Sequence, residues 1–530
     1  MKNHKTSTLR GAALAVAVFG LFNSYGSAQD SSATSPASSD AAIRELQDQV
    51  RQLQTLVQEM RNENAQSRAE MHQLRQDLQA TRALLEKPGA ANEAVAQSAP
   101  EGGSQINAAT AGSQGSTSLE NRVQKLEDST SLLGSKIDEQ YQTKVETASK
   151  YRARLHGIVL MNAFRNIGGS DNLDFPSYAM PVPDGSPEAT VGATLRQSEI
   201  GLEIFGPNVA GARTSADIQM DFAGGFAGIG NGVDFGIVRL QTASVRVDWE
   251  HTSVVAGQDS LFISPLSPTS FASLATPAFA FAGNLWGWTP QLRLEHRFAL
   301  SDQQAITIQG GILDNLDWEY SSSPFFRSAQ AGELSGQPAY AFRTAWSRPV
   351  QGHPISFGVA GYYGRQNWTW DRYVDAWAAM ADWQIPILPR LGLSGEFYRG
   401  RGIGGLGGAI GTSIVYGGEQ SNPFTPIRGL NTAGGWTQLK LQLTQKLELN
   451  GVVSMDDGFA SDIRGFASDA NNGGPLGSIL GRNRGALGNV VFRPRSDLLL
   501  SAELRRLRTF PVYTSSSFTN QASVAMGILF

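Results

Sequence analysis

The residues of this sequence that could carry out chemistry are few, and one short spacing stands out among them. His251-Thr252-Ser253 places a histidine two residues before a serine, and a histidine within hydrogen-bond reach can activate a serine hydroxyl as a nucleophile. The chain has six histidines and no cysteine, which excludes thiolate metal ligands, thiol nucleophiles and disulfides. No spacing of the His-Glu-x-x-His type occurs, so the sequence implies no metal and no cofactor. A hydrolase built on this pair is the enzyme alternative.

A second group of residues could act by charge rather than by reaction. These residues fall on the polar side of alternating segments: Arg154, Arg246, Gln258, Arg293, Arg297, Arg343, Lys440 and Arg505, with Glu295 and Glu396 among their acidic neighbours. Guanidinium groups stay charged and present forked donors that suit carboxylates. If these side chains line one aqueous space, Arg293, Arg297 and Arg343 favour a mild preference for anions. The alternative is that the two signs pair with each other and leave little selectivity.

The segments that must position these residues alternate apolar and polar side chains. In residues 437–444, for example, Leu439, Leu441 and Leu443 alternate with polar residues. A period of two with one apolar face predicts β-strands. Sixteen strands are expected, at residues 152–164, 194–205, 213–223, 236–249, 253–262, 289–299, 304–314, 338–348, 354–364, 372–385, 391–401, 434–445, 447–456, 485–493, 497–508 and 518–530.

The lengths of the connections indicate which face of the strands meets water. Connections after even strands are short, as at 250–252 and 494–496, whereas most of those after odd strands are long, as at 166–193 and 402–433. Short turns on one rim and long loops on the other are typical of outer-membrane β-barrels, whose apolar residues face outward. The sequence therefore predicts an all-β transmembrane fold, a sixteen-stranded antiparallel barrel over residues 151–530. Eighteen strands are the alternative, if loop 402–433 hides a hairpin near residues 412–416.

The chain before residue 151 has a different organisation. Lys2, Lys5 and Arg10 precede an apolar stretch at 11–21, and small residues end at Ala28, so residues 1–28 are interpreted as a signal peptide. Residues 29–42 are expected to be a disordered N-terminus. Residues 87–118 are rich in Ala, Gly, Ser and Gln and are interpreted as a flexible linker. Residues 119–150 repeat apolar positions as a second short coiled coil would.

Residues 43–86 carry a longer heptad repeat. Acidic residues at the g positions precede arginines at the following e positions, the pattern by which parallel coiled coils pair charges between chains. A periplasmic coiled coil that joins copies of the chain is therefore predicted. Its core positions are Ile43, Leu46, Val50, Leu53, Val57, Met60, Asn64, Met71, Leu74 and Leu78.

An exported coiled coil, a linker and a sixteen-stranded barrel ending in Phe530 together resemble outer-membrane porins, in particular the DcaP-like trimeric porins. The local sequences that resemble this family are Arg196-Gln197-Ser198 with Gly201, Asp221-Phe222-Ala223-Gly224-Gly225, Ala256-Gly257-Gln258 and Pro290-Gln291-Leu292-Arg293. The resemblance implies a homotrimer in the lipid of the cell outer membrane. It also implies a third loop folded into each pore and the diffusion of small, often acidic, solutes.

The segment at residues 263–288 fits the position of that third loop. It contains no charged residue, unlike the acidic constriction loops of general porins. Its aromatic residues could narrow the lumen by bulk or could pack at a contact between subunits (Phe271, Phe279, Phe281, Trp286 and Trp288).

The function expected from these patterns is passive diffusion of small hydrophilic solutes across an outer membrane. Lys and Arg total 43 against 47 Asp and Glu, and this balance argues against a broadly basic binder of nucleic acid. One alternative is a structural tether or plug whose coiled coil reaches toward the cell wall. The least favoured alternative is a barrel phospholipase, because His251 and Ser253 fall in a turn rather than on the barrel wall.

Overall fold

The structure is a computed structural model, and it describes residues 152–226, 236–301, 303–317, 327–350, 353–473 and 478–530. The predicted signal peptide (1–28), N-terminal segment (29–42), coiled coil (43–86), linker (87–118) and second coiled coil (119–150) lie outside these residues. The coiled-coil core positions from Ile43 to Leu78 therefore remain predictions.

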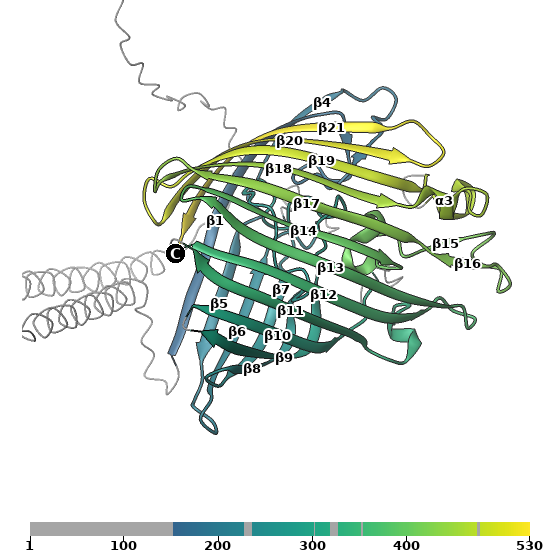
Figure 1. The fold of residues 1–530 in the computed structure, drawn as a ribbon. Coiled ribbons are helices and arrows are strands. Elements are labelled where there is room, and N and C mark those ends of the chain that lie inside the picture. Colours follow the sequence, from purple (N-terminus) through teal and green to yellow (C-terminus); the bar gives the residue numbers. More distant parts are fainter. Residues whose placement is uncertain (1–151, 227–235, 302, 318–326, 351–352, 474–477) are drawn as a thin grey trace, which may run out of the picture. The chain divides into compact units, whose positions relative to one another are not determined.

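The described chain forms one large antiparallel sheet that closes on itself (Figure 1). Neighbouring strands along the chain pair with each other, and β1 pairs with β21 to close the ring. The strands of this sheet are β1 (Arg152–Ile167), β4 (Ala189–Thr194), β5 (Glu199–Phe205), β6 (Arg213–Asp221), β7 (Arg239–Asp248), β8 (Thr252–Ser260), β9 (Trp288–Ser301), β10 (Gln304–Leu313), β11 (Ala339–Val350), β12 (His353–Asn367), β13 (Tyr373–Leu388), β14 (Leu391–Arg401), β17 (Asn431–Gln442), β18 (Leu447–Gly458), β19 (Leu480–Phe492), β20 (Leu498–Pro511) and β21 (Ser517–Leu529).

Strands β4 and β5 occupy a single position in the barrel, because both pair with β1 on successive stretches. The seventeen segments of the sheet therefore make sixteen barrel strands, and the predicted sixteen-stranded antiparallel barrel is confirmed. The strand expected at 194–205 differs in detail. It begins at Ala189 and is interrupted between Thr194 and Glu199, where three consecutive polar residues break the alternation.

The loop between β14 and β17 contains the hairpin that the eighteen-strand alternative required. Strands β15 (Ile414–Tyr416) and β16 (Ile427–Gly429) pair only with each other, in a separate two-stranded sheet. The hairpin exists, but it does not extend the described barrel. The other short elements are β2 (Gly169–Ser170), β3 (Ala179–Met180), η1 (Glu333–Ser335), η2 (Gly404–Leu406), η3 (Gly408–Gly411), α3 (Ala460–Ile463) and α4 (Asp469–Asn472).

The outer wall of this barrel is mainly apolar, and the inner wall carries most of the polar side chains of the strands together with several apolar patches. On the outer wall, Leu294 and Val524 are 52% and 58% exposed. On the inner wall, Gln438 and Asn450 are only 2% and 5% exposed. A closed barrel satisfies every strand hydrogen bond without a sheet edge, which is the condition for crossing a hydrocarbon layer. Within the described residues, no helix has both the length and the apolar character needed to span a membrane.

The two ends of the barrel differ as the connection lengths predicted. The short-turn rim carries tight connections, such as the one from Asp248 at the end of β7 to Thr252 at the start of β8. The long-loop rim carries extended loops, such as the one between β18 and β19 that holds α3 and α4. Both ends of the described chain lie by short connections: Arg152 is opposite Phe205, where β5 ends, and Leu529 donates to Asp497 in the connection between β19 and β20. Figure 1 marks the C-terminus on this side of the barrel.

Candidate functional site

The loop between β8 and β9 lies inside the barrel and divides its interior. This inner loop (residues 261–287) packs its apolar side chains against three patches of the inner wall: one on β10–β14, one on β17–β20 and one on β1 and β21. Because these strands follow one another around the barrel, the loop covers one continuous side of the interior. The remaining side is formed by β5–β9, which the loop touches at the start of β7, where Arg239 donates to the Ala275 carbonyl.

The break between β4 and β5 supplies the first polar anchor of the inner loop. The side chain of Gln197 is fully buried there. Its Nε2 donates to the carbonyl of Ala272 at 3.1 Å, and its Oε1 accepts from the backbone nitrogens of Leu274 (2.7 Å) and Ala275 (3.3 Å). The strand must turn inward to bring this side chain to the loop, which explains why the alternation fails at Arg196-Gln197-Ser198.

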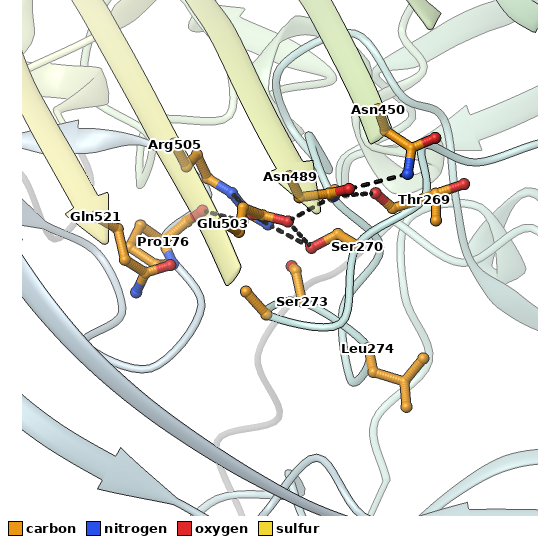
Figure 2. Close-up of polar contacts among 12 residues, drawn as sticks. Pro176, Thr269, Ser270, Ser273, Leu274, Asn450, Asn489, Glu503, Arg505 and Gln521 are labelled. Carbon is orange, nitrogen blue, oxygen red and sulfur yellow. Dashed lines mark hydrogen bonds and ion pairs between the residues drawn. The ribbon is translucent and has the colours of Figure 1, made fainter. Parts of the chain in front are cut away.

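A buried ion pair on β20 supplies the second anchor (Figure 2). Arg505 donates to Glu503 at 2.8 Å and to the Ser270 hydroxyl at 3.0 Å, while that hydroxyl donates to Glu503 at 2.7 Å. Asn489 of β19 donates to the Thr269 carbonyl at 2.7 Å. The expectation that Arg505 lines open water does not match this geometry, because the inner loop covers its guanidinium and leaves it only 2% exposed.

A third anchor involves Glu396 on β14. Its carboxylate accepts from the Ser264 hydroxyl and from the Leu266 backbone nitrogen, the latter at 2.8 Å. Glu396 is therefore also covered by the inner loop rather than exposed in the lumen. Lys440 on β17 is different, since it stays half-exposed with its Nζ 3.5 Å from Glu448.

Facing the inner loop across the lumen, the inward side chains of β5–β9 form a charged wall. Arg246 bridges Asp248 (2.7 Å) and Glu295 (2.9 Å). Arg293 bridges Glu295 (2.8 Å) and Asp259 (2.7 Å). The two arginines share Glu295, so positive and negative charges alternate along the wall and largely neutralise each other.

Two more ion pairs lie beyond the charged wall, one on each side of it. On β11, Arg343 pairs with Asp382 of β13 at 2.8 Å; these side chains are only 12% and 5% exposed, so Arg343 is largely buried on the side that the inner loop covers. Near the short-turn rim, Arg154 pairs with Glu203, and both line a cavity of about 460 Å³ together with His156 and Asp217. Arg297 follows Glu295 on the same face of β9; it is exposed and has no ion-pair partner within the described residues.

Gln258 occupies a different place from the one expected. It pairs across the sheet with Pro290, an exposed residue of β9 whose neighbours Leu292 and Leu294 are also exposed. Gln258 therefore lies on the outward face of β8. Its amide donates to the carbonyls of Leu240 (3.2 Å) and Gln241 (2.9 Å), where a register shift in β7 frees backbone groups.

The aromatic residues of the inner loop pack on one another and on the inner wall. Phe279 is buried beside Trp436 and Leu487, and Phe271 packs against the apolar patch on β1 and β21. The Phe281 and Trp286 rings are 6.0 Å apart, and Trp286 meets Trp288 edge-on at 5.4 Å. These contacts all lie within one chain, and the narrowing of the lumen by these residues stays a prediction.

The proposed hydrolase pair is not assembled. The Ser253 hydroxyl donates to the carboxylate of Asp248, which also accepts from Arg246. The His251 ring is exposed at the short-turn rim, with Nε2 3.8 Å from Glu250. Within the described residues, no group of three His, Asp or Glu side chains is placed to hold a metal ion.

The comparisons with known proteins identify the fold. No protein-family model and no curated protein matches the chain. Among solved structures it is similar to the outer membrane channel DcaP of Acinetobacter baumannii, with 15% identity over 72% of this chain and 99% of that chain, and a TM-score of 0.52. It is also similar to the anion-selective porin of Comamonas acidovorans (12% identity, 72% and 100% coverage, TM-score 0.43) and to OprB of Pseudomonas putida (12%, 72% and 94%, 0.44). The expected resemblance to the DcaP channel is confirmed at the level of the fold.

Proposed function

We propose that this protein is an outer-membrane porin, a channel through which small hydrophilic solutes diffuse passively. The observation that carries the proposal is the division of the barrel interior. An uncharged inner loop packs on one side, and a wall of charged side chains on β5–β9 faces it across the lumen. A channel of this kind selects by the diameter of the path, by its lining groups and by electrostatic barriers. The apolar outer wall is what a barrel needs in order to sit in lipid.

The preference for anions is the finer part of the proposal, and it depends mainly on Arg297. Arg293 and Arg343, which the sequence analysis grouped with it, each lie against carboxylates. Arg297 is exposed at the end of the charged wall and lacks such a partner within the described residues. We therefore expect a weak preference for anions and place its source at Arg297.

The proposed assembly is a trimer in outer-membrane lipid, with the short-turn rim and the N-terminal arm on the periplasmic side. This orientation follows from the usual arrangement of short periplasmic turns and long outer loops. The tether or plug alternative uses the same arm and predicts a barrel closed by its inner loop. Conductance separates the two, since a porin gives open channels of defined size.

The experiment is single-channel recording of the purified full chain in planar bilayers, combined with its mass in detergent. Wild-type protein should give discrete conductance steps, and in a salt gradient its reversal potential should have the anion-selective sign. Arg297→Gln should move that potential toward zero, whereas Arg348→Gln should not, because Arg348 lies on the outer face of β11, two residues from Trp346, whose ring stacks on the exposed Phe357. Absence of conductance steps would favour the plug, and a clear cation preference would overturn the role of Arg297.

A further inference from the structure

Four arginines stand on the outer wall of the barrel, where lipid is expected. Arg165 on β1, Arg484 on β19, and Arg506 and Arg508 on β20 are all exposed. Their strands are consecutive around the barrel, in the order β19, β20, β21, β1 (Figure 1). Within the described residues, none of the four forms an ion pair with a carboxylate. We call these four residues the outer arginine cluster.

The sheet register brings like charges face to face in this cluster. Arg484 lies directly opposite Arg508 in the β19–β20 ladder. Directly opposed like charges destabilise a strand pair. The ring of Phe510 lies 5.6 Å from the Arg484 guanidinium and 4.9 Å from that of Arg508, and a π face attracts both cations but does not neutralise them. The arrangement is understandable if an anion binds between the two guanidinium groups.

The cluster lies at one definite height on the outer wall. Arg165 is opposite Ala522 of β21, and the outward residues from Ala522 down to the short-turn rim are apolar: Val524, Met526, Ile528 and Phe530. The stretch from Phe530 to Ala522 is about 27 Å along the strand at roughly 3.4 Å per residue, or about 21 Å along the axis for a tilt of about 40°. Outer-membrane barrels have an apolar band about 25 Å tall. The arginines therefore begin where the hydrocarbon ends, on the long-loop side.

A groove runs beside the cluster on the same outer surface. It has a volume of about 450 Å³ and is lined by Arg165, Ile167, Ala486, Leu504, Arg506 and Ala522. The small side chains of Ala486 and Ala522 form its floor. In the sheet register, Ala486 is opposite Arg506, and Ala522 is opposite both Arg165 and Leu504, so the larger side chains stand around the two alanines. The groove thus has an apolar floor for a hydrocarbon chain and two unpaired guanidinium groups at its edge.

We propose that the outer arginine cluster is a binding site for the phosphate-bearing headgroup of an anionic membrane lipid, with one acyl chain in the groove. Guanidinium groups bind phosphate through paired, charge-assisted hydrogen bonds. An arginine near the boundary of the hydrocarbon can also extend its head to the polar layer while its stem stays in the apolar one. The bound lipid neutralises the opposed charges of Arg484 and Arg508.

The test uses the full chain in nanodiscs of phosphatidylcholine that contain a minor fraction of lipid A, a diphosphorylated glycolipid. Lipid that stays bound after transfer to detergent is counted by native mass spectrometry. Wild-type protein should retain lipid A, and the double variant Arg165→Gln/Arg506→Gln should retain about tenfold less, as expected for the loss of charge-assisted hydrogen bonds. Arg165→Lys/Arg506→Lys keeps the positive charges but loses the paired N–H donors of the guanidinium groups, and it should retain an intermediate amount of lipid A.

The matched control is Arg348→Gln/Arg390→Gln, which removes two exposed arginines from the short-turn rim. It should retain lipid A like the wild type, and single-channel conductance should show that all variants are folded. Equal retention by the cluster variant and the wild type would overturn the site. Displacement of the lipid by an equal concentration of inorganic phosphate would overturn the assignment to a lipid, because the acyl chain would then contribute nothing. Neither result depends on the solute that the pore conducts.

Discussion

The anchoring of the inner loop by Gln197 gives the sharpest prediction about this barrel. Gln197→Ala removes one side chain that makes three hydrogen bonds to the loop backbone: one to the Ala272 carbonyl and two from the nitrogens of Leu274 and Ala275. The methyl group that remains cannot replace any of them. Two N–H donors and one carbonyl, all in a buried place, lose their partner.

The magnitude follows from the number of groups left unsatisfied. Each costs about 1–3 kcal/mol, so the low end of the range gives about 3 kcal/mol for the three groups. Since about 1.4 kcal/mol corresponds to a factor of ten, local opening of this part of the inner loop should become about a hundredfold more frequent. The other anchors, at Glu396 and Glu503, are untouched. The barrel should therefore stay folded while residues 270–276 open.

The assay is amide hydrogen exchange followed by mass spectrometry on peptides that cover residues 266–282, with the protein in detergent. The control is Gln366→Ala, because Gln366 is equally buried and donates to a loop carbonyl at Gly402, which is outside the inner loop. Exchange in the inner loop should accelerate only in Gln197→Ala, and the channel should become noisier in bilayers. Unchanged exchange at Leu274 and Ala275, or the same acceleration in both variants, would refute the anchoring role.

Three further predictions concern stability, measured as unfolding by guanidinium in detergent and followed by tryptophan fluorescence. Glu503→Gln should destabilise the protein by about 3–5 kcal/mol, because the buried Arg505 loses its counter-charge, and adding Arg505→Met should recover part of that loss. Gly283→Ala should cost about 2–4 kcal/mol, since Gly283 has φ +110° and a methyl group would clash with the backbone oxygens of Gly435 and Met455; Gly336→Ala, at φ +75° in open space, should cost only about 1 kcal/mol. Val524→Arg on the lipid face should cost about 2–4 kcal/mol, whereas Ser244→Arg, on the inward face of β7 and opposite Asp217, should be nearly neutral.

The architecture could be predicted from the sequence because its signals are local. Alternation along each strand, the contrast between short and long connections, and the carboxy-terminal apolar strand each concern a few neighbouring residues. Together they define strand number, pairing order and the face that meets lipid. Even the hairpin at β15 and β16 was located, although alternation alone could not show that it pairs outside the barrel.

The fate of each inward residue could not be predicted, because it depends on where the inner loop runs. Arg246 and Arg505 are both inward arginines next to inward carboxylates, yet Arg246 lies on the charged wall and Arg505 is buried under Ser270. The local sequence around Arg246 and around Arg505 does not show which of the two side chains the inner loop will cover. The prediction that Gln258 lines the pore failed for a different reason. Gly257, at φ +137°, and the register shift in β7 allow the Gln258 amide to donate hydrogen bonds to backbone carbonyls of β7. Gln197 was missed as an anchor, although the three consecutive polar residues around it were a visible signal.

The absence of charge in the inner loop has a consequence for the whole lumen. An uncharged segment can be buried against the apolar patches on β10–β14 and β17–β20 without an ion pair of its own. Its hydrogen bonds to the wall join two neutral groups, as at Gln197, or a neutral loop group and a charged side chain, as at Glu396. It cannot, however, supply a counter-charge to the opposite wall. The arginines and carboxylates of β5–β9 must then neutralise one another within the wall, as Arg246, Glu295 and Arg293 do. In the proposed pore, the bulk of the inner loop would exclude solutes, and unpaired charges such as Arg297 would discriminate between ions.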